Sequence, residues 1–112
     1  MTMKIAYFGT PALSEKLLVL LLSKGLEISY IVTQPDKPIG KRLEIMPSPV
    51  KTCALEHSIP FFDTELNIKT EGALIEELTS RQINLCILFA YGKIISEKLL
   101  KTPISGFWNV HP

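Results

Sequence analysis

The chain has 112 residues, of which 46% are hydrophobic and 21% are charged, and its formal net charge is +1. This composition is that of one globular domain, and it excludes a protein drawn to nucleic acid by its overall charge. Cys53 and Cys86 are too few for a disulfide framework or a metal centre, so each is predicted to be a buried, reduced thiol. An apolar run begins directly after Lys4, which leaves no room for a signal peptide, and residues 17–22 are too few to span a bilayer. We therefore expect a cytoplasmic protein without a membrane partner.

The first segments of the chain follow a strand pattern and then a helix pattern. Residues 5–8 form a short apolar run that ends at Gly9, which is typical of a buried parallel strand. Thr10 then offers an N-cap hydroxyl and Pro11 the fixed φ of a first helical residue, so we expect a helix that ends at Gly25. The polar residues of this helix, Ser14 among them, are expected largely outside its apolar face, which consists of Leu13, Leu17, Leu18, Leu21 and Leu22.

The stretch after the second predicted strand, residues 27–33, differs in character. Residues 34–49 contain four prolines, and each proline removes a backbone hydrogen-bond donor, which excludes regular structure throughout. Over residues 34–51 the cations outnumber the carboxylates, and they are Lys37, Lys41, Arg42 and Lys51. A flexible basic loop of this kind can lie against phosphates, and RNA is often recognised by such contacts. The residues alone leave a solvated surface loop as the alternative.

The second half of the chain continues the alternation of strands and helices. Ser48 and Pro49 repeat the combination of a cap and a proline, and His57 is expected at the exposed end of the helix that they begin. That helix is predicted over residues 50–56, and the elements after it over residues 60–62 (strand), 71–80 (helix capped by Thr70), 85–90 (strand), 97–100 (helix) and 106–110 (strand). This order predicts an open, mostly parallel α/β sheet, and right-handed crossovers would place helices on both of its faces.

Ligands bind such sheets beyond the carboxyl ends of the strands. That rule selects three segments here, residues 9–11, 90–92 and 109–111. The first segment has a single glycine where the dinucleotide-binding fingerprint needs three, so a NAD or FAD site is not expected. It can be a tight turn with a helix cap or the wall of a small-molecule cleft, and the sequence leaves both interpretations open.

Asn109 and His111 carry the chemistry of the last segment. Residues two apart on an extended strand face the same way, so an amide and an imidazole would converge on one spot. The amide can donate to a developing oxyanion, and the imidazole can move a proton near neutral pH. This pair would suit acyl transfer through a tetrahedral intermediate. The residues alone leave a structural pair with satisfied hydrogen bonds as the alternative.

Five blocks of the sequence, taken together, resemble methionyl-tRNA formyltransferases in their order and spacing. They are residues 8–11 (FGTP), 32–38 (VTQPDKP), 46–51 (MPSPVK), 90–92 (AYG) and 109–112 (NVHP). The resemblance covers nearly the whole chain and implies that residues 1–112 are the Rossmann-like N-terminal catalytic subdomain of a formyltransferase. It also implies the reaction, which is transfer of a formyl group from 10-formyltetrahydrofolate to the amino group of methionyl initiator tRNA in translation initiation. Neither a metal nor a DNA partner is expected.

The resemblance assigns roles to individual residues. Asn109 would hold and polarise the formyl oxygen, and His111 would stabilise the charge of the tetrahedral intermediate and assist proton movement. The folate pocket would be lined by Gly9, Thr10, Pro11, Ala90, Tyr91 and Gly92. The tRNA would be contacted by Lys37, Lys41, Arg42 and Lys51.

The sequence also departs from the family pattern, because members continue after the His-Pro pair. They add a Ser-Leu-Leu-Pro segment, a catalytic aspartate, further strands and a C-terminal barrel domain, none of which lies within these 112 residues. We therefore expect the isolated chain to have little or no transferase activity. Two alternatives stay open: another formyltransferase or hydrolase that uses 10-formyltetrahydrofolate, or a truncated binding domain without catalysis.

Overall fold

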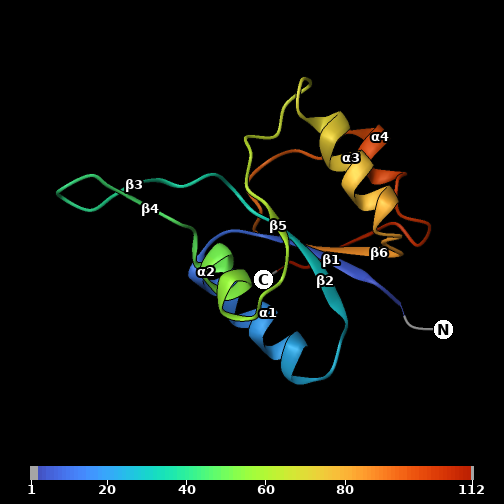
Figure 1. Ribbon diagram of the computed structural model, residues 1–112, viewed down its shortest axis with the longest axis horizontal. Coiled ribbons are helices and arrows are strands. Elements are labelled where there is room, and N and C mark those ends of the chain that lie inside the picture. Colours follow the sequence, from blue (N-terminus) through green and yellow to red (C-terminus); the bar gives the residue numbers. More distant parts are fainter. Residues whose placement is uncertain (1–2, 112) are drawn as a thin grey trace.

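A five-stranded sheet forms the centre of the computed structural model, which describes residues 3–111 (Figure 1). Its strands lie in the order β5-β2-β1-β6-β7, and every pairing between them is parallel. Their bounds are β1 Ile5–Gly9, β2 Ile28–Val32, β5 Phe61–Phe62, β6 Leu85–Phe89 and β7 Phe107–Asn109. The apolar runs of β1 and β6 place these strands in the middle of the sheet, where both faces are buried. The strand order reverses between β1 and β6, so this is the switch point of the sheet.

Helices cover both faces of the sheet, which confirms the predicted fold class. Their bounds are α1 Ala12–Ser23, α2 Pro49–Glu56, α3 Glu71–Ser80 and α4 Glu97–Leu100. Because side chains alternate along a strand, Tyr7 of β1 packs in the core beneath α1 and α2, whereas Phe8 packs in the core beneath α3 and α4. Within residues 3–111, no helix is long and apolar enough to cross a membrane.

Of the predicted helix caps, Ser48 was confirmed and Thr10 was wrong, whereas Thr70 holds the N-cap position of its helix without a side-chain hydrogen bond to it. The Ser48 hydroxyl accepts a hydrogen bond from the N–H of Lys51 (3.0 Å) and so caps α2. The first helix begins at Ala12 with Pro11 in the N-cap position, and the Thr10 hydroxyl donates instead to a carbonyl across the switch point. Thr70 already has helical dihedral angles, and its hydroxyl bonds within the preceding turn. The Thr10 and Thr70 hydroxyls thus bond to groups outside their helices, whereas the Ser48 hydroxyl bonds to the helix that it begins.

The first helix is rotated relative to the predicted apolar face. Ser14 is fully buried, whereas the Leu13 side chain is 56% exposed, so both of these assignments were wrong. Leu18 is buried and Leu17, Leu21 and Leu22 are partly buried against the sheet, as predicted. The cause is the close approach of the first helical turn to β1, because a small side chain is needed there and Ser14 supplies it.

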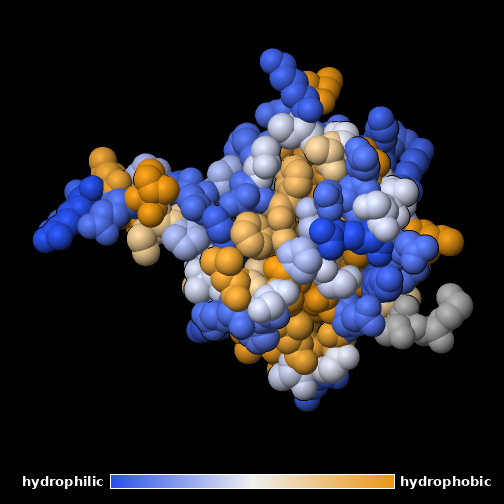
Figure 2. All heavy atoms as spheres, in the orientation of Figure 1, coloured by the Kyte–Doolittle hydropathy of each residue, from blue (hydrophilic) through white to orange (hydrophobic). Residues whose placement is uncertain are grey.

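The proline-rich stretch contains a β-hairpin, where the sequence indicated a flexible loop. Its strands are β3 Lys37–Ile39 and β4 Glu44–Met46, which pair antiparallel. A proline is tolerated in such a ribbon, because each strand has one free edge that needs no N–H donor. Both strands are exposed, and the hairpin projects from the body of the protein (Figure 1). Its surface mixes basic residues with large apolar ones (Figure 2), the latter being Ile39, Leu43, Ile45 and Met46.

The other local predictions agree with the structure to within one or two residues. Gly25 follows α1 with a positive φ of 84°, which suits the end of a helix. Cys53 and Cys86 are buried and free, as predicted. His57 is the exposed C-cap of α2, and its Nδ1 lies 2.9 Å from the carbonyl oxygen of Cys53.

Candidate functional site

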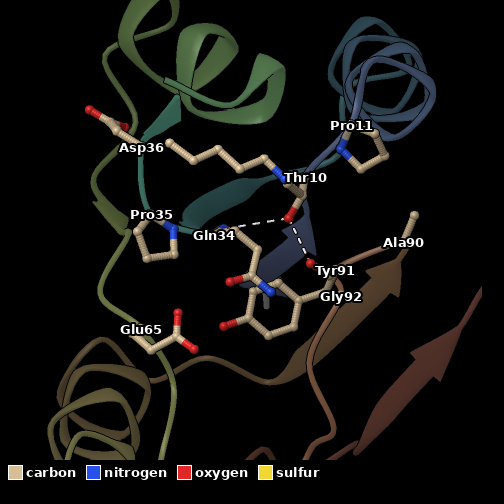
Figure 3. Close-up of a pocket in the computed structure, with 10 residues that line it drawn as sticks. Thr10, Pro11, Gln34, Pro35, Asp36, Glu65, Ala90, Tyr91 and Gly92 are labelled. Atoms are coloured by element: carbon tan, nitrogen blue, oxygen red, sulfur yellow. Dashed lines mark hydrogen bonds between the residues drawn. The ribbon is translucent and has the colours of Figure 1, made fainter. Parts of the chain in front are cut away.

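A pocket of about 590 Å³ opens at the carboxyl ends of β1, β2 and β6, at the switch point (Figure 3). Its lining residues come from the segments that follow these strands and from one residue after β5. They are Thr10, Pro11, Gln34, Pro35, Asp36, Lys37, Glu65, Ala90, Tyr91 and Gly92. The sheet thus places its ligand-sized cavity where open α/β folds bind their substrates.

The Thr10 hydroxyl ties the three strand ends of the pocket together. It donates a hydrogen bond to the carbonyl oxygen of Tyr91 (2.7 Å) and accepts one from the N–H of Gln34 (3.4 Å), as Figure 3 shows. One side chain after β1 therefore fixes the segments after β6 and β2. The floor of the pocket is set before any ligand arrives.

The segment after β6 bends sharply, and its bend depends on Gly92. Ala90 and Gly92 both have positive φ values, 55° and 99°. A Cβ atom on Gly92 would lie 3.0 Å from Nε2 of Gln34, so the amide of Gln34 rests against bare backbone. A non-glycine residue with positive φ, such as Ala90, is uncommon.

Gly9 lies beneath the pocket and has a packing role. A Cβ atom there would lie only 1.8 Å from Oγ of Ser14. That hydroxyl donates to the carbonyl oxygen of Phe89 (2.7 Å), and the Tyr7 hydroxyl donates to the carbonyl oxygen of Ser14 (2.8 Å). The absence of a side chain at Gly9 thus allows α1 to start directly against β1 and β6, which brings Pro11 to the rim.

Two carboxylates line the pocket, and each of them forms an ion pair with a lysine. Lys51 donates to Asp36 (3.0 Å), and Lys93 forms an ion pair with Glu65. Hydrogen bonds from Lys51 to Asp63 and to Asp36 raise the pKa of its ammonium, which therefore stays charged. Both carboxylates of the pocket wall thus have a cationic partner.

Tyr91 is the largest side chain beside the pocket and is only 1% exposed. Its ring packs edge-on against Phe8, with 5.4 Å between the ring centroids. Burial, together with the Glu65 carboxylate, raises the pKa of the phenol to about 12, so it stays protonated. Its hydroxyl has no hydrogen-bond partner within residues 3–111. Figure 3 shows this hydroxyl on the side of the ring that faces Glu65.

Asn109 and His111 lie outside this lining, at the end of the neighbouring strand. Asn109 is the last residue of β7 and pairs with Leu88 of β6, and the N–H of Val110 donates to the carbonyl oxygen of Leu88 (2.8 Å). Asn109 and His111 are both exposed. The structure therefore places this pair at the same edge of the sheet as the pocket, one strand further along.

The four predicted cations are divided between the pocket, the hairpin and an ion-pair cluster. Lys37 lines the pocket, while Lys41 and Arg42 lie exposed in the turn of the hairpin. Lys51 belongs to α2, and its ammonium is held between Asp36 and Asp63. The structure thus separates Lys51 from the other three cations.

Sequence reasoning missed several pocket residues. Gln34, Pro35 and Asp36 lie just beyond the end of β2, so the rule about carboxyl ends could have selected them. Glu65 gave no such signal, because it lies in an irregular segment three residues after β5. Only the fold brings it to the pocket.

Known proteins similar to this chain agree with this architecture. Among curated relatives, the methionyl-tRNA formyltransferases of Thermotoga maritima and Listeria innocua are 39% and 42% identical to it over 98% and 96% of its length. The chain spans about a third (34%) of the length of each. The solved structure of glycinamide ribonucleotide transformylase 1 from Geobacillus kaustophilus shares the fold, with 21% identity and a TM-score of 0.74 over 100% of this chain and 59% of that one. A formyltetrahydrofolate deformylase from Burkholderia mallei (18% identity, TM-score 0.68, 99% of this chain and 38% of that one) does so too.

A model of the formyl transferase family matches residues 3–112, which is nearly the whole chain. This match covers all of the elements that form the pocket, together with Asn109 and His111. On this evidence the chain belongs to the formyl transferase family.

Proposed function

We propose that this chain is the N-terminal part of the catalytic domain of an enzyme that formylates methionyl initiator tRNA with 10-formyltetrahydrofolate. The observation that carries the proposal is the identity of 39% and 42% to relatives named methionyl-tRNA formyltransferase over nearly the whole chain. The chain spans about a third of their length, so the proposal assigns the complete activity to a polypeptide of that length. The 112 residues alone are expected to show little or no turnover.

The pocket at the switch point is the proposed site of the folate donor. Its volume lies in the range of small-ligand pockets, which is roughly 300–1,000 Å³. Thr10 and Pro11 supply one part of its wall and residues 90–92 another, and the positive φ values of Ala90 and Gly92 bend the chain sharply there. Backbone groups at such a bend can hydrogen-bond the edge of a heterocyclic ring. The Thr10 hydroxyl holds both segments in place for this purpose.

Asn109 and His111 are the proposed catalytic residues. In the reaction the amino nitrogen of methionine attacks the formyl carbon, and the carbonyl oxygen takes up negative charge in a tetrahedral intermediate. The Asn109 amide donates to that oxygen. His111 accepts the proton that the amine loses and returns it to N10 of the folate as the bond from the formyl carbon to N10 breaks. The position of β7 beside β6 supports this assignment, because it brings the pair to the edge of the sheet that carries the pocket.

The hairpin is the proposed tRNA contact. Lys37, Lys41 and Arg42 lie on a ribbon that projects from the body and is open to solvent on both strands. An exposed basic ribbon of this kind can follow the phosphates of an acceptor stem. The chain as a whole has a net charge of only +1, so the attraction must be local.

The test uses a chimera in which residues 3–111 replace the matching part of the Listeria innocua relative. We expect it to formylate methionyl initiator tRNA, and Asn109→Ala and His111→Asn each to lower kcat by roughly a hundredfold or more. His57→Asn is the matched control, because His57 is also exposed but lies at the end of α2. Full turnover by both variants would contradict the assignment. Formyl transfer to glycinamide ribonucleotide, or release of formate without an acceptor, would show that the activity is that of another formyl-folate enzyme.

A further inference from the structure

The hairpin is joined to the body by two legs, residues 33–36 and 47–48, and a pair of hydroxyls links them. Oγ1 of Thr33 and Oγ of Ser48 lie 2.6 Å apart, and both residues are buried. The Ser48 hydroxyl also accepts a hydrogen bond from the N–H of Lys51, so the start of α2 is linked to the same pair of hydroxyls. The base of the hairpin is therefore fixed to the sheet and to a helix.

Lys51 adds an ion-pair cluster just above this point. Its ammonium donates to both carboxylate oxygens of Asp36 (3.0 and 3.2 Å) and to Asp63 (2.8 Å), and its side chain is only 16% exposed. It also lies over the ring of Phe61, 5.3 Å from the centroid. Asp36 belongs to the first leg and to the pocket wall, whereas Asp63 directly follows β5. One ammonium thus connects the hairpin leg, the end of a strand and α2.

The hairpin strands themselves contribute little to holding the direction of the hairpin. Both of its strands are exposed, and a two-stranded ribbon on its own is only marginally stable in water. Two carboxylates face Lys51, so this cluster of three charged groups carries a net negative charge and would repel a phosphate. Lys51 therefore differs from Lys41 and Arg42, which are exposed in the turn of the hairpin.

We propose that Lys51 is a positioning residue that holds Asp36, and with it the hairpin and the adjoining pocket wall, in the orientation needed for substrate binding. It does so without contacting tRNA itself. This inference rests on the proposed function where it concerns tRNA. Its structural part, a fixed hairpin, is independent of any activity.

The structural part is tested by pulsed electron paramagnetic resonance on the chimera, with spin labels at Lys41→Cys on the hairpin and Lys24→Cys at the end of α1. We expect a narrow distance distribution with lysine at position 51, a clearly broader one for Lys51→Met, and recovery of the narrow one for Lys51→Arg, which can still bridge two carboxylates. Asp36→Asn should broaden it as Lys51→Met does. A broad distribution with lysine at position 51, or a narrow one for Lys51→Met, would overturn the proposal whether or not the chimera is active.

The functional part is tested by measuring tRNA binding over a series of salt concentrations. Lys51→Met is expected to weaken binding roughly fivefold without changing the slope of log affinity against log salt, since no phosphate contact is lost. Lys41→Ala, the matched control, should lower the magnitude of that slope by about 0.7 to 0.9. Asp36→Asn should reproduce the loss, and the double variant should be no worse than either single one. A lower slope for Lys51→Met, with unchanged or tighter binding by Asp36→Asn, would show that Lys51 contacts phosphate directly.

Discussion

The pocket and the hairpin are held in place by different means. The floor of the pocket rests on fully buried contacts, in which Gly9, Ser14 and Tyr7 bring α1 against the sheet. The hairpin has no core of its own and depends on the hydroxyls and ion pairs at its base. Damage to the pocket floor should therefore reduce the stability of the whole fold, whereas damage to the exposed hairpin strands and their turn should reduce binding alone.

The largest effect on stability is expected at Gly9. Gly9→Ala would bring a Cβ atom to 1.8 Å from Oγ of Ser14 and to 3.0 Å from the backbone oxygen of Phe89, so the helix must move away from the sheet. We expect a loss of about 3 kcal/mol in the free energy of unfolding, at the upper end for an overpacked core. Urea unfolding followed by circular dichroism measures it.

The control is Gly72→Ala in α3, where a Cβ atom would meet no other group within 4 Å. It should leave stability unchanged or raise it by about 0.4–1 kcal/mol, because alanine restricts the unfolded chain. Equal losses for the two variants would show that the first turn of α1 can shift without cost. The pocket floor would then not be held more rigidly than the hairpin.

The buried part of the fold should also be sensitive to alkali. Burial raises the pKa of the Cys86 thiol from its ordinary 9.0 to about 12. Above pH 9 the unfolded chain gives up a proton that the folded chain keeps, so stability must fall as pH rises towards the folded pKa. One such group lowers the free energy of unfolding by about 1.4 kcal/mol per pH unit in that window.

Urea unfolding between pH 9 and pH 10 tests this expectation, because burial raises the pKa of Tyr30 and Tyr91 from 10.0 to about 12 and those phenols contribute mainly above that window. Burial also raises the pKa of the Cys53 thiol from its ordinary 9.0, so Cys53 contributes in the same window. Cys86→Ala should flatten the dependence of stability on pH in this range. The difference in the free energy of unfolding between the Cys86→Ala variant and the unchanged chain at pH 7 gives the effect of lost packing alone. An unchanged slope in the variant would mean that Cys86 titrates normally in the folded state.

An intermediate effect is expected at Gly92, where stability and ligand binding can be separated. Gly92→Ala must adopt a φ of 99°, and its Cβ atom would lie 3.0 Å from Nε2 of Gln34. We expect a loss of about 1–2 kcal/mol in stability from the left-handed backbone and a weaker affinity for the folate donor. Gly106→Ala is the matched control, since its φ is 76° and a Cβ atom there meets nothing within 4 Å.

Both glycine variants should therefore lose similar stability, whereas only Gly92→Ala should bind the donor more weakly, as isothermal titration of the chimera would measure. Equal donor affinity in the two variants would show that Gln34 can move without affecting the pocket. The proposed folate site would then have to lie elsewhere.

Much of the fold follows from local sequence. The apolar runs of β1 and β6 and the Ser48-Pro49 start of α2 could be predicted because each signal lies within the element that it specifies. The burial of Ser14 could not, because it depends on Gly9 and Phe89, which only the folded sheet brings against the helix. The hairpin was also missed. Its prolines argue against a strand unless the strand has a free edge, and the local sequence does not show whether an edge is free.

The candidate site divides in the same way. The rule about carboxyl ends predicted the segments after β1 and β6, because it needs only the order of the elements. It gave no indication of Glu65, whose place in the pocket depends on the path of the chain after β5. The charge of Lys51 was visible in the sequence, but its two carboxylate partners were not, because one lies 15 residues before it and the other 12 residues after it.

The smallest effect on stability is expected at the tip of the hairpin. The double variant Lys41→Ala/Arg42→Ala removes two exposed side chains from the turn, so the free energy of unfolding should change by less than about 0.5 kcal/mol. Binding of methionyl initiator tRNA by the chimera should nonetheless weaken, and each lost phosphate contact should lower the salt slope by about 0.7 to 0.9. The double variant Lys16→Ala/Lys24→Ala, in α1 and at its C-cap, makes the same change in net charge at exposed sites away from the hairpin. If both variants weaken tRNA binding equally, the attraction follows from net charge, and the hairpin is not the contact surface. If the hairpin variant alone also destabilises the fold, the turn takes part in the packing of the body, and the two regions are not held independently.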